Sequence, residues 1–505
     1  MLLLAVAYAA LHVYHMSDDH GWIGGHTHET DASADYALVN YFVEQRCHQH
    51  RQAGDDCLFF NSGDFIQGSG LSDAGTPIGT FVYDILSLTS YDAITVGNHD
   101  ISVEGTTDWV QRMLTKLLGE RLVTTNVIVE ESIGSHLLGS PYRVLDLPQS
   151  GIRVVVIGLL HQRAGADGVY ATDPALLYKD PLFQEIVDLL PEMVIVLFHQ
   201  GYDTDPNSFN AIRTSFRASL PPRTPIIFLG GHEHKQLWVY PFQDPEEGEE
   251  DFDALVSEPG YHARFISHLT IVPEAKGQGL RRAQKTDIPT DPTVLEDILG
   301  EPFKRFPDPS ARRIQERFKL YSRGLDLGRI LGIAPRTYEW PSTPTLSDGV
   351  WSLWLSEIIP TVLYPLDPTP LKAHEYCYIS GSSFLPNGIF KGPVTLDDTY
   401  AFMPYTNERF IVFRAIPGDV LVQVYEYLSK SRKAHRDGMV PYYIWPLPQN
   451  LKSGELYDIV VVEYDSSAVQ KALEAFGVDV SPEIFTDLDA HDVFVRFVKA
   501  HWQDE

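Results

Sequence analysis

The sequence contains few cysteines, few basic residues and no long apolar run. Its 505 residues include three cysteines, and 39 Lys and Arg stand against 68 Asp and Glu, which gives a net charge of −29. This charge repels polyanions, so it argues against nucleic acid or an anionic membrane surface as a partner. No apolar stretch reaches the roughly 20 residues that a transmembrane segment needs. There is also no Asn-x-Ser/Thr acceptor for N-glycosylation.

Length and composition indicate a globular protein of two domains, because one ordinary hydrophobic core does not extend over so long a chain. Two local features stay open. Cys47 and Cys57 either form a disulfide, which would fit an oxidising compartment, or remain free thiols. The apolar start, residues 1–10, is either a clipped signal peptide or part of the first strand, which continues over 11–16. We favour the strand for at least the second half of this stretch.

Short apolar runs rich in β-branched residues recur through the first half of the chain, with helix-like segments between several of them. Continuous apolar runs of this kind indicate a sheet that is covered on both faces. Open α/β sheets place their sites at the carboxyl ends of their strands. The residues that follow each run are therefore the first candidates for function. The predicted strands are 11–16, 57–61, 93–96, 151–158, 193–198 and 225–229.

Oxygen and nitrogen donors follow most of these strands. The set combines carboxylate, amide and imidazole groups without a thiolate, which suits Zn, Mn or Fe. In Asp18-x-His20 and His232-x-His234, alternate side chains share one side of an extended segment. Two ions that share a carboxylate need this many ligands, and Asp64, alone at its strand end, is the natural bridge. The predicted metal ligands are Asp18, His20, Asp64, Asn98, His199, His232 and His234.

The donors fall into five motifs, which are Asp18-x-His20, Gly63-Asp64, Gly97-Asn-His-Asp100, His199 and Gly231-His-x-His234. In this order they resemble the calcineurin-like metallophosphoesterase superfamily. Within it the chain is similar to the two-domain 5′-nucleotidases and UDP-sugar hydrolases, most of all to their fungal relatives. The resemblance implies an α/β fold (α+β overall), a four-layer metallophosphoesterase β-sandwich flanked by helices with a smaller C-terminal α/β domain.

With this resemblance, the chain divides into three parts. A dimetal phosphoesterase domain is expected over residues 1–285. A linker with an inter-domain helix is expected over 286–324, where the sequence begins rich in Pro and Asp. A 5′-nucleotidase-type substrate-binding domain is expected over 325–505.

The resemblance also assigns roles to the site residues. Asp18, His20, Asp64 and His234 would hold one ion, and Asp64, Asn98, His199 and His232 the other. His99 would stabilise the transition state or protonate the leaving oxygen. A catalytic histidine is usually oriented by a carboxylate, but the family's Asp is replaced here by Ser102. Asp100 or Glu104 could take its place, or His99 acts alone.

The substrate-binding motifs of the family are only partly present. Residues 391–395 and 404–407 match two of them, but 378–384 lacks the Asn and the Arg of a third. An Arg there would make a bidentate contact that neither Ser nor Phe can replace. Arg409 and Lys391 are candidates to compensate. The predicted substrate-binding residues are Tyr405, Asn407 and Tyr464, the two tyrosines as a sandwich for a base.

These observations predict a dimetal-dependent phosphohydrolase. It would hydrolyse the phosphomonoester of 5′-nucleotides or related small phosphate esters, by attack of a hydroxide that bridges the two ions. Three alternatives stay open: a phosphodiesterase, a phosphoprotein phosphatase, or a catalytically retired metal-binding protein. The resemblance suggests a secreted or vacuolar location. His26, His28, His48 and His50 match no family motif and are predicted to be loop histidines without a function.

Overall fold

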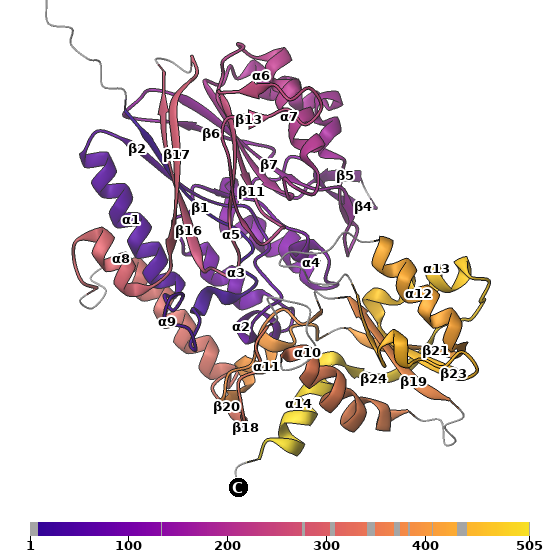
Figure 1. The fold of residues 1–505 in the computed structure, drawn as a ribbon. Coiled ribbons are helices and arrows are strands. Elements are labelled where there is room, and N and C mark those ends of the chain that lie inside the picture. Colours follow the sequence, from indigo (N-terminus) through magenta and orange to yellow (C-terminus); the bar gives the residue numbers. More distant parts are fainter. Residues whose placement is uncertain are drawn as a thin grey trace, which may run out of the picture. The chain divides into compact units, whose positions relative to one another are not determined.

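The computed structural model describes residues 9–132, 134–274, 278–303, 309–340, 349–367, 374–381, 384–406, 408–431 and 442–503. These residues form two compact units (Figure 1). Unit 1 contains the chain up to Gln67 and Ala74–Leu325, and unit 2 contains Gly68–Asp73 and the chain from Asp326 onward. In the described part of the chain, no helix is both long and apolar enough to cross a lipid bilayer.

Unit 1 is built on two sheets. In the first, β1 (Leu11–Met16) runs parallel to β2 (Asp56–Asn61) and antiparallel to β16 (Phe265–Pro273). The strand order is β17-β16-β1-β2-β3, with β3 at Ala93–Ile94 and β17 at Leu280–Pro289. The second sheet has the order β12-β15-β11-β10-β7-β6. Its strands are β6 (Arg143–Asp146), β7 (Arg153–Leu160), β10 (Met193–His199), β11 (Ile226–Gly230), β12 (Gln236–Val239) and β15 (Ala254–Pro259).

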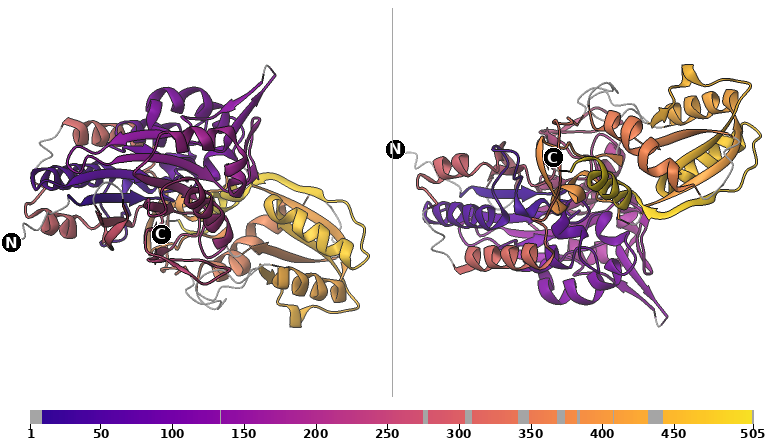
Figure 2. Two further views of the ribbon diagram at one scale, coloured as in Figure 1. Left: turned by 90° about the horizontal axis from the view of Figure 1, so that it is seen from above. Right: turned by 90° about the horizontal axis from the view of Figure 1, so that it is seen from below.

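The alternation of side chains along the strands decides where the core forms. Leu11 and Val13 of β1 pack with Ile195 and Leu229 of the second sheet, in a core that lies between the sheets. The other face of the second sheet is also apolar, and helices α6 (Pro181–Asp188) and α7 (Pro206–Ser219) cover it. On the first sheet, α1 (Tyr36–Gln52) packs against β1 and β2. These four layers confirm the predicted α/β sandwich with flanking helices (Figures 1 and 2).

The described parts of the segment predicted as a linker, residues 286–303 and 309–324, belong to unit 1 and consist largely of regular elements. Strand β17 extends to Pro289, and α8 (Pro292–Leu299) follows it. Helix α9 (Pro309–Gly324), predicted to lie between domains, runs beside α1 (Figures 1 and 2) and buries Ala311, Ile314 and Phe318. The Tyr321 hydroxyl donates to Asp84 of α3 (Thr80–Ser87). The apolar side of α9 therefore packs against other elements of unit 1.

Unit 2 is organised around one sheet of order β22-β19-β23-β21-β24. One face carries a core with the helical segments η7 (Leu353–Leu363) and α14 (Ala490–His501). The other face packs on α12 (Gly418–Ser431) and α13 (Glu463–Ala475). The strands are β19 (Glu375–Gly381), β21 (Arg409–Pro417), β22 (Tyr442–Trp445), β23 (Leu456–Val462) and β24 (Glu483–Asp489).

Cys47 and Cys57 form a disulfide, so the open alternative of free thiols is excluded. The bridge joins α1 to β2, with the two Cα atoms 5.2 Å apart. Both residues are buried, and the third cysteine, Cys377, is a buried free thiol. The bridge therefore fastens the last turns of α1 to the central strands of unit 1.

Replacing Cys47 with serine is expected to lower the free energy of unfolding by about 2–3 kcal/mol, since the bridge closes a short loop in the unfolded chain. Urea denaturation of the wild type and of Cys47→Ser, each with and without a reductant, measures this. Reductant should destabilise the wild type and leave the variant unchanged. Equal stability of the oxidised wild type and the variant would show that the bridge does not contribute.

Candidate metal centre

The seven predicted ligands come from five strand ends of unit 1, and the structure brings the six Asp and His residues among them together. Three overlapping groups of side chains each place their ligand atoms within 4.8 Å of one another. One contains Asp18, His20 and His234, and another contains Asp64, His199 and His232. The third contains His20, Asp64 and His99, and so connects the other two. The parallel strands β1, β2 and β3 end at one edge of their sheet, which explains why loops distant in sequence meet there.

The Asp64 carboxylate lies at the centre of the arrangement. Its Oδ2 is 3.1 Å from His199 Nε2 and 3.8 Å from His20 Nε2. Its Oδ1 accepts a hydrogen bond of 2.8 Å from the backbone N–H of His99. Asp18 Oδ1 is 3.5 Å from His234 Nε2 and 3.9 Å from His199 Nε2. One carboxylate oxygen therefore faces imidazoles of both groups, which is the geometry expected of a bridging ligand.

The histidine tautomers follow from the opposite ring nitrogens. His20 Nδ1 is 2.9 Å from the carbonyl oxygen of Ile66, and His199 Nδ1 is 2.7 Å from that of Ser62. A carbonyl only accepts, so both Nδ1 atoms carry a proton and both Nε2 atoms present a lone pair. The Nε2 lone pair of His20 faces His234 Nε2 at 3.0 Å. Lone pairs that converge on one another and on carboxylates favour a cation between them.

Two further observations fit a metal ion. Asn98 Oδ1 and His199 Nε2 are buried without a hydrogen-bond partner among the described residues. Burial lowers the pKa of His199, but the carboxylates of Asp64 and Asp18 outweigh it and raise that pKa to about 9. The site thus attracts positive charge, and the imidazole, carboxylate and amide donors suit a divalent ion of the Zn, Mn or Fe type.

The backbone at these ligands is strained. Asp18, His20, Asp64, His232 and His234 all have a positive φ, between 48° and 75°. The left-handed region costs a residue with a Cβ free energy, and such residues gather at functional sites. Here the left-handed conformation turns the chain sharply after β1, β2 and β11. The side chains that follow these strands therefore converge.

Two positions in the ligand loops require glycine, because a neighbouring loop lies too close for a side chain. A Cβ added at Gly97 would lie 2.1 Å from Asp64 Oδ1, and one added at Gly231 would lie 2.7 Å from Asp18 Oδ2. Both contacts are far inside van der Waals distance and involve predicted ligands. The glycines of the Gly-Asn-His and Gly-His-x-His motifs therefore make room for carboxylates.

His99 lies at this centre, but its ring hydrogen-bonds to an amide rather than to a predicted carboxylate partner. The ring Nδ1 bonds to the Gln67 side-chain oxygen, a partner that the sequence did not indicate. Glu104 is exposed. Asp100, predicted to be catalytic, is fully buried, and its carboxylate hydrogen-bonds to the neighbouring loops. It accepts hydrogen bonds from the Tyr83 hydroxyl and from the backbone N–H groups of Asp64, Phe65 and Gly97 at 2.7–3.1 Å.

Three more side chains support the centre. Asp19 is fully buried and accepts hydrogen bonds from Asn61 and Tyr36, so it fixes the strand ends rather than facing solvent. The ring centroids of His161 and His232 are 4.6 Å apart. His262 donates its backbone N–H to the Asp18 carbonyl at 2.7 Å. Both histidines come from loops with no recognisable motif.

Two of the four histidines predicted to be loop residues lie in a helix, and the other two lie in a loop. His48 and His50 lie in α1, which continues to Gln52. His26 is buried, stacks on Trp22 with ring centroids 4.1 Å apart, and bonds to the His262 carbonyl. His28 is the exposed loop residue that was expected.

In unit 2 the predicted substrate-binding residues are only partly assembled. Tyr405 is half-buried and stacks on Phe384, with ring centroids 5.9 Å apart and planes 13° apart. Tyr464 is 68% exposed at the start of α13. Arg409, one candidate to replace the missing Arg, pairs with Glu463 instead. Asn407 lies outside the described residues.

The architecture of both units is that of the two-domain 5′-nucleotidases, which defines the class of fold. The crystal structure of a 5′-nucleotidase from Candida albicans matches with a TM-score of 0.85 and 18% identity, over 98% of each chain. In sequence, an uncharacterized protein of Schizosaccharomyces pombe is 21% identical over 100% of this chain and 93% of its own length. A secreted protein of Arthroderma benhamiae is 25% identical over 83% of this chain and 67% of its own. No protein-family model matches the chain.

Proposed function

We propose that the chain is a phosphoric ester hydrolase that depends on two divalent metal ions. The observation that carries this proposal is the convergence of six carboxylate and imidazole donors, with Asp64 facing both histidine groups. The likeness to a 5′-nucleotidase structure supports the same reading. A pair of bound Zn, Mn or Fe ions would activate water and neutralise the charge of a phosphate group.

In this proposal the protein residues bind the ions, donate a proton and orient the proton donor. Asp18, His20, Asp64 and His234 hold one ion, and Asp64, Asn98, His199 and His232 hold the other. His99, adjacent to Asn98, donates a proton to the leaving oxygen or stabilises the transition state. Gln67 sets its orientation, because the side-chain oxygen fixes which ring nitrogen carries the proton.

The substrate proposed is the phosphomonoester of a 5′-nucleotide or a related small phosphate ester. Unit 2 retains aromatic side chains that can stack on a base, namely Tyr464 and the Phe384–Tyr405 pair. It lacks the Arg of the family motif at 378–384, so recognition of the rest of the ligand differs from that of the family. We therefore expect turnover of several nucleotides with relaxed selectivity.

A phosphate-release screen tests this function. The purified chain is assayed in Mn²⁺ or Zn²⁺ with AMP, UMP, UDP-glucose, p-nitrophenyl phosphate, bis-p-nitrophenyl phosphate and a phosphopeptide. Turnover of AMP or UMP is the expected result. Hydrolysis of the generic monoester alone would remove the nucleotide assignment, and preference for the diester or the phosphopeptide would favour a phosphodiesterase or a protein phosphatase. Bound metal without turnover of any ester would indicate a retired enzyme.

Replacing Tyr464 with alanine is expected to raise KM for a nucleotide by about tenfold and to leave kcat nearly unchanged, because base–aromatic stacking contributes about 1–3 kcal/mol. Tyr427→Ala, which removes another exposed tyrosine of unit 2, serves as the matched control. For p-nitrophenyl phosphate neither variant should differ from the wild type. An unchanged KM for nucleotides in Tyr464→Ala would remove this residue from the binding site.

The proposed location is outside the cytosol, secreted or vacuolar. The Cys47–Cys57 disulfide is typical of oxidising compartments. One sequence relative is described as a secreted protein.

A further inference from the structure

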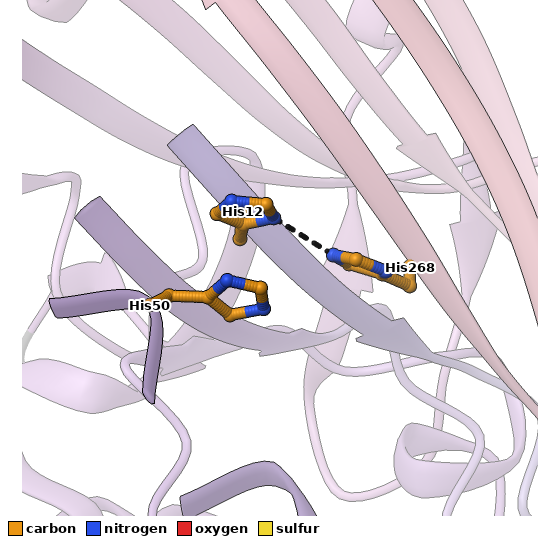
Figure 3. A group of neighbouring side chains, drawn as sticks. All are labelled: His12, His50 and His268. Atoms are coloured by element: carbon orange, nitrogen blue, oxygen red, sulfur yellow. Dashed lines mark hydrogen bonds between the residues drawn. The ribbon is translucent and has the colours of Figure 1, made fainter. Parts of the chain in front are cut away.

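Three histidines that no motif explains meet on the face of the first sheet opposite the core between the sheets. His12 lies near the start of β1, and the register pairs His12 with Thr270 and Tyr14 with His268. Residues two apart share a face, so the side chains of His12, Tyr14 and His268 project on one side. His50 reaches the same place from the last turn of α1. Figure 3 shows the three rings converging.

This cluster is distinct from the metal centre described above. His12 precedes Met16, the last residue of β1, by four residues, which corresponds to roughly 13 Å along the strand. It also lies at the opposite end of β1 from the strand ends that carry the predicted ligands. Neither group shares a residue with the other.

The three rings approach as closely as the ligands of a metal site do. Each offers a ring nitrogen, and these nitrogens lie within 4.8 Å of one another. His12 Nδ1 is 2.9 Å from His268 Nε2. The rings of His12 and His50 are stacked, with centroids 3.5 Å apart. His12 and His50 are buried, while His268 is partly exposed, so solvent reaches one side of the cluster.

The outer nitrogens already have partners of the kind that metal-ligating histidines use. His12 Nε2 is 3.5 Å from the Asp55 carboxylate, which is itself held by a 2.8 Å hydrogen bond from the Ala10 backbone N–H. His50 Nε2 is 3.1 Å from the Tyr14 hydroxyl. A carboxylate behind the ring fixes the tautomer and leaves the opposite nitrogen with its lone pair. This leaves Nδ1 of His12 and of His50 to act with Nε2 of His268.

The charge state is also the one that binds a metal ion. Burial lowers the pKa of His12, and it lowers the pKa values of His50 and His268 to about 3. The nearby Arg46 guanidinium acts in the same direction, and it is engaged with Gln49 Oε1 at 2.6 Å. All three imidazoles are therefore neutral near pH 7, the form in which histidine is a ligand.

We propose that His12, His50 and His268 form an additional site for one divalent transition-metal ion, with Zn²⁺ as the representative cation. An all-imidazole set suits Zn²⁺, Cu²⁺ or Ni²⁺ and does not suit Mg²⁺ or Ca²⁺. Because His12 and His50 are stacked, one ring must rotate about its Cβ–Cγ bond to bring both lone pairs to a shared ion. The ion would then clamp β1, β16 and the end of α1 together, next to the point where the Cys47–Cys57 disulfide holds the same helix end.

Zinc stoichiometry tests the site. Protein stripped with a chelator is loaded with Zn²⁺, freed of excess by gel filtration and analysed for metal, for the wild type, His50→Gln, His268→Gln and His48→Gln. His48 is an exposed residue of the same helix and is the matched control. We expect one equivalent less in the His50 and His268 variants than in the wild type and the control. Phosphate-ester turnover should be the same in all four.

Thermal unfolding of the same proteins supplies a second measurement. It also shows whether a variant that binds less zinc is folded. Zn²⁺ should raise the Tm of the wild type and of His48→Gln more than that of His268→Gln, whose side chain is partly exposed and whose loss the fold tolerates best. Equal zinc content together with equal Tm shifts in all four proteins would overturn the site. The cluster would then be a hydrogen-bonded stack of neutral histidines.

Discussion

Asp64→Asn is expected to lose bound metal and to reduce phosphate-ester turnover by about 1,000-fold or more, since an ion-binding charge is lost at the reacting centre. Asparagine keeps the shape of the side chain and an oxygen that can still accept the N–H of His99. What it removes is the negative charge that faces His199 Nε2 at 3.1 Å and His20 Nε2 at 3.8 Å. Because this one carboxylate contacts both ligand groups, its neutralisation should affect both ions.

Metal analysis and kinetics on the same preparation make this result interpretable. Asp146→Asn, which removes an exposed carboxylate of unit 1, is the matched control and should keep full metal content and activity. Circular dichroism establishes that both variants fold. If Asp64→Asn retained two ions and normal turnover, the residue would not be a bridging ligand and the proposed arrangement would be wrong.

His99→Ala should show the complementary behaviour, with kcat lowered by about 10²–10⁴-fold, the usual contribution of a general acid or base. Both ions should remain bound, because the proposed arrangement gives each ion four other ligands, although His99 Nε2 is 4.0 Å from Asp64 Oδ2. Steady-state kinetics with a nucleotide and metal analysis of the same sample measure the two effects. Loss of metal in this variant would mean that His99 is a ligand rather than a proton donor.

Gln67 provides an internal check on that assignment. In Gln67→Ala the His99 ring stays in place but loses the oxygen that orients it, so kcat should fall less than in His99→Ala. Adding Gln67→Ala to His99→Ala should then cause no further loss, since both changes act through one ring. Additive losses would show that Gln67 acts independently.

Sequence reasoning predicted the cluster of candidate ligands because its residues follow strands that can be recognised locally. The buried strands β2 and β10 are short apolar runs, and the donors Asp64 and His199 stand at or just beyond their ends. Parallel strands bring such ends to one edge, so the convergence of residues far apart in sequence follows from the fold class. The left-handed backbone at five of the predicted ligands could not be predicted, because most Asp and His residues have a negative φ even though both types are enriched in the left-handed region.

The errors have equally local causes. The stretch after residue 286 was interpreted as a linker because it is rich in Pro and Asp. In the structure Asp291 caps α8, accepting from the Thr293 backbone N–H at 2.6 Å, and Pro292 is its first residue. Proline at that position starts a helix rather than interrupting one. Asp100 is adjacent to His99 in the sequence, but its carboxylate accepts hydrogen bonds from Tyr83 and from three backbone N–H groups.

Gln67 and the histidine cluster escaped prediction for another reason. Gln67 reaches His99 through a loop whose path depends on its own φ of 68°, and glutamine is not a residue type that indicates catalysis. His12, His50 and His268 are brought together only by the β1–β16 register and by the packing of α1 on the sheet. Neither contact is encoded in a local pattern, so both required the three-dimensional structure.

The most direct test of the central claim is a metal titration of the stripped protein with phosphate release from a 5′-nucleotide as the readout. Zn²⁺ or Mn²⁺ is added in steps, and bound metal and turnover are measured at each step in the wild type and in Asp64→Asn. We predict that turnover appears only as the ions bound through Asp64 accumulate, reaches its plateau when both are present, and stays absent in the variant. Full occupancy of these ions in the wild type without hydrolysis of any nucleotide would contradict the proposed function.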